Sequence, residues 1–241
     1  MPHPEPHATG QWRRAQITTT RVASTFAPDA ATIALVEAAW AAAQAKPGVH
    51  LFDGPTCRLE RLEATPDHLH LAWSPSSYKW FLGTNGTHPH VAQRGDAIGT
   101  SAAVVSSDGW LVFGRRSTAV PLYPGYAHPF GGILEPAANV DVIAEMEREL
   151  QEELDLGPSE LADLVCLGLG VDPRLRQPEL LYLAQTTRSR TELERRMDPA
   201  EHSGCWCVRA TADDLDTVLR DPAGDLTPVT RLVLERYRAT I

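Results

Sequence analysis

The run Arg148-Glu149-Leu150-Gln151-Glu152-Glu153-Leu154 constrains this chain more than any other segment. Each residue of a helix lies about 100° beyond the one before it, so Glu149, Glu152 and Glu153 fall on one helical face. Like charges at these i, i+3 and i+4 spacings repel each other, and a helix with a purely structural role would gain by pairing them with lysine. A hard cation such as Mg²⁺, which takes oxygen ligands, would remove the repulsion. The alternative is a solvated acidic face.

The whole segment 141–154 is expected to be helical. Its apolar residues recur at helical spacing, roughly a third of a turn away from the carboxylates. They are Val142, Ile143, Met146, Leu150 and Leu154. One face can therefore pack on a core while the acidic face stays open to a ligand.

Segments before and after this helix alternate between strand and helix patterns. Strands are predicted over 57–64, 68–73, 101–106, 110–115, 165–171, 180–186 and 204–209. Further helices are predicted over 30–46, 191–197, 211–219 and 228–239. Asp108-Gly109 is a strong turn pair for a hairpin between two of the strands. This order predicts an α/β protein with a mixed sheet and helices on its faces.

The chain has 241 residues, enough for one large domain or one domain with an extension. We expect a disordered tail over 1–15, an N-terminal extension over 16–96 packed on the main domain, and the main domain over 97–241. The first residues are rich in Pro and His, which is typical of a mobile end.

Charge and cysteine content restrict the function classes. The net charge is -9, so a global basic field for nucleic acid is absent, and phosphates must be bound by local arginine, lysine or metal. The four cysteines lack zinc-type spacing and are interpreted as reduced thiols. With no targeting signal and no run long enough to span a membrane, we expect a cytoplasmic protein without a membrane partner.

With Gly132 upstream, the acidic run resembles the Nudix box, whose pattern is Gly-x5-Glu-x7-Arg-Glu-apolar-x-Glu-Glu-x-Gly-apolar. The residues in register are Arg148, Glu149, Leu150, Glu152, Glu153 and Leu156. This resemblance implies an α/β/α sandwich of the Nudix type, with a divalent-metal site carried by a loop-helix-loop. It also implies hydrolysis of a nucleoside diphosphate linked to another group.

The flanks of the box depart from the pattern. The interval before Arg148 is two residues longer, Val140 stands where the first Glu belongs, and Asp155 stands where the late Gly belongs. Glu135 or Glu145 could replace the missing acid, although each could equally be a solvated surface residue.

Segments outside the box narrow the resemblance to the uridine diphosphate glucose pyrophosphatase branch, whose animal members have a lengthened box and an N-terminal extension. They are Leu51-Phe52-Asp53-Gly54, Tyr78-Lys79-Trp80-Phe81-Leu82-Gly83-Thr84-Asn85, Gly131-Gly132-Ile133-Leu134-Glu135-Pro136 and Glu201-His202-Ser203-Gly204. The resemblance covers most of the chain after about residue 50. It implies cleavage of UDP-glucose or UDP-galactose to UMP and a sugar 1-phosphate. Two alternatives stay open, which are ADP-ribose or a dinucleotide as substrate, and a non-catalytic module that senses nucleotide sugars.

The chemistry assigns a role to each box residue. Glu149, Glu152 and Glu153 would hold Mg²⁺, or Mn²⁺, which neutralises a pyrophosphate and activates water. One of them, or the loop residue Glu201, would act as general base. The resemblance implies that Arg148 orients a catalytic glutamate; a plain surface ion pair is the alternative.

Other residues are candidates for binding a small nucleotide-sugar substrate. Tyr78 and Phe52 could stack on uracil and Arg116 could bind the diphosphate, unless they serve packing or surface charge. Lys79 and Asn85 could meet phosphate or sugar hydroxyls.

Three more candidates lie nearer the box in sequence or pattern. Gly131 and Gly132 allow the backbone to bend and approach closely. Glu179, which opens a predicted strand, could reach the metal. The protein is expected to be a monomer or a homodimer.

Overall fold

The computed structural model describes residues 7–46, 51–118, 120, 122–221 and 224–241. Within them the main sheet has eight strands, ordered β1-β9-β10-β5-β6-β11, with β7 beside β6 and β8 beside β5. The strands are β1 (Ala8–Trp12), β5 (Gly99–Val105), β6 (Trp110–Arg116), β7 (Ala127–His128), β8 (Phe130–Ile133), β9 (Leu161–Val171), β10 (Pro178–Thr186) and β11 (His202–Arg209). Strands β10 and β5 run parallel while their neighbours pair antiparallel, which confirms the predicted mixed sheet.

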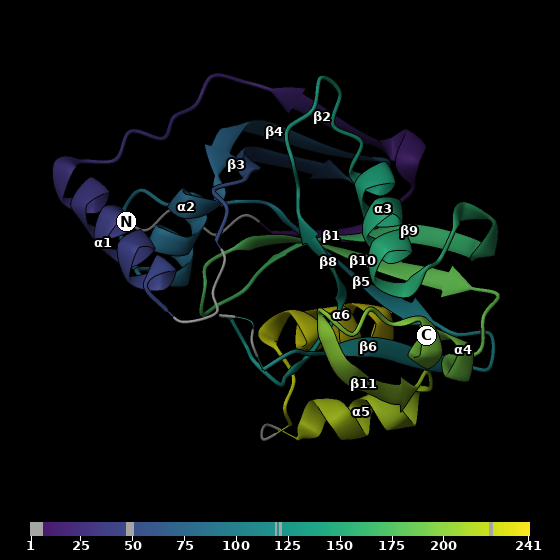
Figure 1. The fold of residues 1–241 in the computed structure, drawn as a ribbon. Coiled ribbons are helices and arrows are strands. Elements are labelled where there is room, and N and C mark those ends of the chain that lie inside the picture. The colour runs from purple at the N-terminus through teal and green to yellow at the C-terminus, as the bar shows by residue number, and fades with distance from the viewer. Residues whose placement is uncertain (1–6, 47–50, 119, 121, 222–223) are drawn as a thin grey trace.

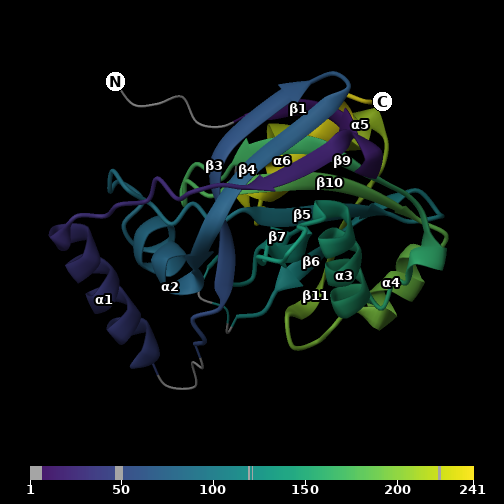
Figure 2. The same ribbon diagram turned by 90° about the horizontal axis from the view of Figure 1, so that it is seen from above.

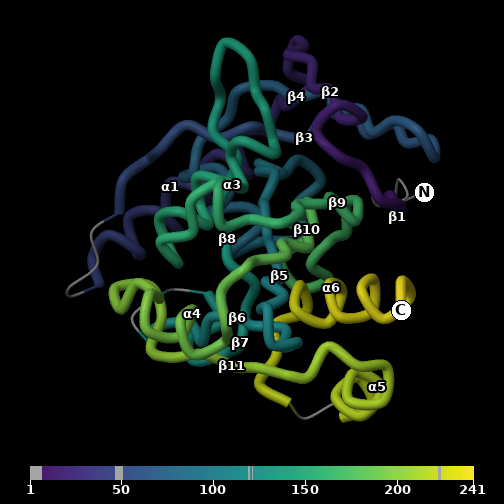
Figure 3. Tube along the Cα trace, turned by 90° about the vertical axis from the view of Figure 1, so that its right-hand side faces the viewer, coloured from purple at the N-terminus to yellow at the C-terminus, as the bar shows by residue number. Residues whose placement is uncertain are grey.

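Helices cover both faces of this sheet (Figure 1). Helix α3 (Val142–Leu154) packs on one face, and α5 (Ala212–Arg220) and α6 (Pro228–Arg238) lie on the other, as Figure 3 shows from the side. Each face has its own apolar cluster, one holding the α3 stripe and the other holding Val233 and Leu234 of α6. The short α4 (Arg190–Arg196) lies between β10 and β11 in the chain. The predicted α/β/α sandwich is confirmed.

Helix α3 forms as its sequence pattern predicts. The Asp141 side chain caps it by accepting hydrogen bonds from the backbone N–H groups of Ile143 and Ala144, both at 3.0 Å. Its predicted apolar stripe is buried, with Met146 and Leu150 fully inaccessible. Truncating such a leucine to alanine typically costs about 2–5 kcal/mol, so this stripe is what holds the helix on the sheet.

The N-terminal extension forms a second sheet with the order β2-β4-β3. Its elements are β2 (Ile17–Arg21), α1 (Ala30–Gln44), β3 (Pro55–Thr65), β4 (His68–Ser77), α2 (Tyr78–Phe81) and a π-helical turn (Leu82–Gly86). Figure 2 shows α1 and α2 together at one end of the molecule. Backbone hydrogen bonds of Cys57 with Leu134, at 2.8 Å, and with Ile98, at 2.9 Å, join β3 to the main body. The domain boundary near residue 96 stays a prediction.

The predicted disordered tail is wrong from Ala8 onward, while residues 1–6 lie outside the described part. Strand β1 pairs with β9 and so becomes one edge of the main sheet. Trp12 is 1% exposed, and its indole N–H donates to the carbonyl of Thr65 at 2.9 Å. Burial of this large side chain and the open edge of β9 provide the ordering free energy that the Pro- and His-rich composition concealed.

The predictions of the hairpin turn and of reduced cysteines are confirmed. Strands β5 and β6 form a hairpin in which Gly109 has φ of 80°, the left-handed conformation that a turn glycine adopts readily. The four cysteines are free thiols. Among the described residues, no helix combines the length and apolar character that a membrane span needs.

Candidate active site

Helix α3 turns two of its three box carboxylates toward the protein interior. Glu149 and Glu153, one turn apart, are 8% and 3% exposed. Glu152 points to solvent and forms an ion pair with Arg148 at 2.6 Å. The predicted acidic face is therefore divided, because only the i, i+4 pair lies beside the sheet.

The glycines of β8 bring the backbone against these carboxylates. Gly131 has φ of 149°, and its N–H donates to Glu153 Oε1 at 2.7 Å. A Cβ at Gly131 would lie 1.8 Å from the Thr100 carbonyl oxygen, and a Cβ at Gly132 would lie 2.5 Å from Glu149 Oε1. Glycine is required at Gly131, where a side chain would collide with backbone, whereas a side chain at Gly132 would displace the Glu149 carboxylate.

Arg148 contacts three carboxylates at once. Its guanidinium donates to Glu145 at 2.5 Å, to Glu149 at 2.6 Å and to Glu152 at 2.6 Å. These partners raise the pKa of Arg148, most strongly through the hydrogen bond with Glu145. The bond to Glu149 holds that carboxylate in one orientation, which is the role that the resemblance implies for Arg148.

Burial makes the two inward carboxyl groups weaker acids than usual. It raises the pKa of Glu149 to about 7, although the adjacent Arg148 opposes the shift. It also raises the pKa of Glu153, against the hydrogen bond from His202. Two buried carboxylates that are costly to ionise fit a divalent cation, since carboxylate oxygens are the ligands that Mg²⁺ prefers.

His202 is a site residue that the sequence reasoning did not single out. Its Nε2 lies 2.5 Å from Glu153 Oε2, and both side chains are buried. Its Nδ1 has no hydrogen-bond partner among the described residues, and the Phe130 ring packs edge-on at 5.3 Å. A Cβ at Gly114 would lie 2.2 Å from Nδ1, so the glycine makes room for the imidazole. The one available signal was the resembling run 201–204.

The loop residue Glu201 lies beside this pair. One ligand atom each from Glu153, Glu201 and His202 lies within 4.8 Å of the other two. The loop is tied to the helix by a hydrogen bond from Asp198 N to the Glu153 carbonyl at 2.9 Å. The fold thus brings the predicted loop acid to the box, although 47 residues separate Glu201 from Leu154 along the chain.

A cleft with two compartments opens over these groups. The outer compartment, about 380 Å³ in volume, is lined by Phe52, Glu135, Arg148 and Glu149 among others. The inner compartment, about 210 Å³, is lined by Arg116, Tyr123, Asp172, Gln177 and Glu179 among others. The residues lining both are Tyr78, Gly131, Gly132, Ile133 and Glu201. Because these residues line both compartments, the two form one continuous cleft.

Arg116 provides positive charge in the inner compartment. Its Nε donates to the carbonyl of Leu122 at 2.9 Å, which fixes the guanidinium at the end of β6. Burial lowers the pKa of Arg116, and the carboxylates of Glu153, Glu201 and Glu179 oppose that shift. A half-buried guanidinium surrounded by acidic groups is well placed to bind an anionic ligand that is accompanied by a metal cation.

Glu179 lies deeper than the box carboxylates. It is 4% exposed and accepts a hydrogen bond from Ser101 Oγ at 2.6 Å. Burial raises its pKa to about 8, so the carboxyl is largely protonated at neutral pH. It lines the inner compartment and not the outer one that Glu149 lines. Its use as a metal ligand stays a prediction.

The aromatic candidates lie along the cleft. Tyr78 packs edge-on against Trp40 of α1 with ring centroids 6.4 Å apart, and burial raises its pKa. Phe52 is 79% exposed at the outer compartment. An exposed ring at the mouth and a fixed ring further in give two apolar surfaces for a flat base.

Two predicted substrate residues lie elsewhere. Lys79 Nζ forms an ion pair with Glu37 of α1 at 2.6 Å. Asn85 is fully buried, and its amide donates to Asp96 at 3.2 Å and to the carbonyl of Arg176 at 3.1 Å. Neither lines the two compartments. The resembling segment contributes these residues to structure, because its short helix turns Tyr78 and Phe81 toward the cleft.

The irregular flanks of the box have structural explanations. Val140 is buried in the core, and its carbonyl accepts a hydrogen bond from Thr19 of β2 at 2.7 Å. Asp155 takes the left-handed conformation, φ of 51°, that a glycine would take, and Gln151 donates to its carboxylate at 2.8 Å. The lengthened loop therefore docks on the extension, while the stand-in Glu145 contacts Arg148 and Glu135 lines the outer compartment.

A larger cavity, about 520 Å³ in volume, lies away from the box. Two of its arginines are already paired with acids, since Arg58 lies 2.7 Å from Glu60 and Arg94 lies 3.0 Å from Asp96. No Phe, Tyr or Trp is among the described residues that line it. The two-compartment cleft is therefore the candidate site.

Comparison with known proteins agrees with this geometry, although no family model matches the chain. Uridine diphosphate glucose pyrophosphatase NUDT22 of Bos taurus is 32% identical over 169 residues, 60% of this chain and 58% of that protein. The Homo sapiens protein of the same name is 32% identical over 164 residues, 58% of this chain and 53% of that protein. The chain spans little more than half the length of these curated relatives.

One solved structure adds evidence on the fold alone. DR0079 from Deinococcus radiodurans superposes with a TM-score of 0.50 at 16% identity, over 76% of this chain and 98% of that one. The sandwich and the box helix at its face give the chain a Nudix-type fold. Within that class, the expected resemblance to the uridine diphosphate glucose pyrophosphatases is confirmed by the two relatives.

Proposed function

We propose that this chain is a divalent-metal-dependent pyrophosphatase that cleaves a nucleoside diphosphate sugar. UDP-glucose or UDP-galactose is the proposed substrate, and UMP and the sugar 1-phosphate are the products. The relatives named as uridine diphosphate glucose pyrophosphatases support the substrate class. The observation that carries the proposal is the buried pair Glu149 and Glu153, of which Glu149 lines a cleft that also holds Arg116 and Tyr78.

Glu149 and Glu153 would hold the metal, Mg²⁺ or Mn²⁺, and Glu152 would reach it only through a change of side-chain conformation. When bound, such a metal neutralises phosphoryl oxygens and lowers the pKa of a coordinated water. Arg148 keeps Glu149 in position, and His202 does the same for Glu153 from the opposite side. With both carboxylates held, the site is preorganised for charge that develops on the pyrophosphate.

Glu201 is the proposed general base. It is exposed at the cleft, lines both compartments and lies beside Glu153, so a water above the box carboxylates would be within its reach. A carboxylate open to solvent can pass the proton on after each turnover, which the buried Glu179 cannot do as readily.

The substrate would lie along the cleft with its diphosphate between Arg116 and the metal-binding carboxylates. Tyr78 and Phe52 would stack on the uracil ring, since their rings line the outer compartment. Gly131 and Gly132 leave the backbone open to the phosphates. In this proposal the protein acts on a small molecule and has no nucleic acid or membrane partner. Its cytoplasmic location and its state as a monomer or homodimer stay predictions.

The direct test is to incubate the full chain with UDP-glucose and Mg²⁺ and to measure UMP and glucose 1-phosphate. We expect turnover that is abolished by EDTA and restored by Mg²⁺ or Mn²⁺. Tight binding of UDP-glucose in a calorimeter without any turnover would contradict the enzyme and favour a sensing module.

A substrate panel separates the proposed substrate from its rivals. UDP-galactose, ADP-ribose and a dinucleotide would be compared by kcat/KM under one metal concentration. A value for ADP-ribose above that for both UDP-sugars would overturn the proposed specificity and leave the hydrolytic chemistry intact.

A further inference from the structure

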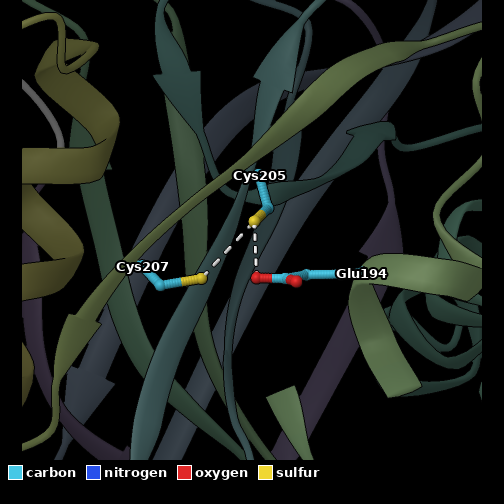
Figure 4. Close-up of side chains that lie close together, drawn as sticks. All are labelled: Glu194, Cys205 and Cys207. Atoms are coloured by element: carbon cyan, nitrogen blue, oxygen red, sulfur yellow. Dashed lines mark hydrogen bonds between the residues drawn. The ribbon is translucent and has the colours of Figure 1, made fainter. Parts of the chain in front are cut away.

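Two cysteine thiols of strand β11 and a carboxylate of helix α4 meet outside the residues that line the cleft. Cys205 and Cys207 are two apart on the strand, so their side chains leave the same face. Their sulfur atoms lie 3.6 Å apart, and Glu194 Oε1 of α4 lies 3.1 Å from Cys205 Sγ. Figure 4 shows the three side chains converging from strand and helix, and their ligand atoms all lie within 4.8 Å of one another.

We propose that Cys205, Cys207 and Glu194 bind a Zn²⁺ ion. Zinc bonds of about 2.3 Å to sulfur and about 2.0–2.2 Å to carboxylate oxygen, at tetrahedral angles, place two sulfurs about 3.8 Å apart and sulfur and oxygen about 3.5 Å apart. The observed separations are 3.6 Å between the two sulfurs and 3.1 Å between Cys205 Sγ and Glu194 Oε1. They differ from the expected values by only a few tenths of an ångström. Small rotations of three side chains would therefore complete the site.

The charge balance of the cluster favours a thiophilic dication. Binding displaces one proton from each thiol to solvent, leaving two thiolates and one carboxylate around Zn²⁺, with a net charge of minus one. Arg190 Nε lies 3.5 Å from Glu194 Oε1 and partly offsets that charge. Water would take the fourth position, as in zinc sites with three protein ligands.

A metal ion suits this cluster better than a disulfide does. A disulfide is a poor alternative, because residues two apart in a strand lie roughly 6.6–6.8 Å apart, at the upper limit for such a bond. The sulfur ligands of this cluster suit a thiophilic metal, whereas the all-oxygen pair Glu149 and Glu153 suits a hard cation.

The test uses the full chain, kept reduced with a phosphine, and Co²⁺ as a spectroscopic substitute for Zn²⁺. We expect a thiolate-to-cobalt charge-transfer absorption that saturates at one equivalent and disappears when Zn²⁺ is added. Cys205→Ser and Cys207→Ser should each abolish most of it. Glu194→Gln should weaken the affinity by about tenfold or more, since even indirect partners of a metal typically contribute that much.

Glu153→Gln is the matched control, because it alters the proposed catalytic metal site and leaves the thiols in place. It should keep the full absorption, so this inference stands or fails separately from the proposed hydrolysis. Melting curves verify that each variant is folded. Absence of the absorption in the wild-type protein, or its persistence in the double variant Cys205→Ser/Cys207→Ser, would overturn the zinc site. A Cys205–Cys207 disulfide found by mass spectrometry in the reduced preparation would also overturn it.

Discussion

Replacing Glu153 by glutamine tests the site most directly. Glu153 is 3% exposed and accepts hydrogen bonds from Gly131 N at 2.7 Å and from His202 Nε2 at 2.5 Å. Glutamine has nearly the same shape, so its oxygen keeps the bond to Gly131 while its NH₂ faces His202. The imidazole must then change tautomer to accept that bond, which exchanges one charge-assisted hydrogen bond for a neutral one.

The two consequences of Glu153→Gln differ greatly in size. Exchanging the hydrogen bond should cost about 1 kcal/mol of stability, a fall in Tm of about 2–4 °C for a chain of this size. Losing a charged ligand of the proposed metal, which stabilises charge on the reacting phosphates, should cost about 3–4 kcal/mol of transition-state stabilisation. At about 1.36 kcal/mol for each factor of ten, kcat should fall by roughly 10²–10³.

The assay is UMP release from UDP-glucose at saturating Mg²⁺, with a melting curve on the same preparation. The matched control is Glu147→Gln, on the same helix, whose side chain pairs with Arg14 at the surface and should leave kcat unchanged. A Glu153→Gln protein with wild-type kcat would refute the reasoning. Equal losses in both variants would point to damage of the helix instead.

Three further predictions address the rest of the site. Tyr78→Ala should raise KM for UDP-glucose by about tenfold with a smaller change in kcat. The control Tyr78→Phe should keep the ring surface and stay near wild type. An unchanged KM for the alanine variant would remove Tyr78 from the substrate site. His202→Ala should lower kcat by about 10–100-fold with little change in KM, as expected for a residue that orients a metal ligand. A change in KM alone would contradict this role of His202. Burial raises the pKa of Glu149 from 4.5 to about 7, so its favourable contribution to metal-free stability is present below pH 4.5 and is lost as pH rises through 7. The metal-free Tm should therefore fall over that window and fall less in Glu149→Gln; a parallel pH profile in both proteins would contradict the assignment.

Local sequence patterns were sufficient for the elements that carry the site. The period of apolar residues and the cap at Asp141 defined α3, and these depend only on neighbours within one or two helical turns. The hairpin turn at Gly109 is local in the same way. The sequence also linked Gly131 and Gly132 with the acidic run, and in the structure Gly131 N–H donates to Glu153 while Gly132 lies beside Glu149.

Long-range contacts decided what local patterns could not. His202 contacts Glu153, which lies 49 positions earlier in the chain, because the order of the strands brings the two side chains together. Asn85 carries polar groups suited to a sugar, yet its amide is used to bind Asp96 and the backbone inside the protein. Neither outcome has a signature in the residues next to it along the chain.

The sequence by itself determined the acidic helix, its packing stripe and the presence of three box carboxylates, because helical periodicity is a local property of the backbone. Only the tertiary structure decided which of them lie inside the protein. The sheet and the β8 glycines cover the side of α3 that holds Glu149 and Glu153, and Glu152 is left in solvent. The environment on each side of a helix depends on what packs there, and that is a matter of segments distant in the chain.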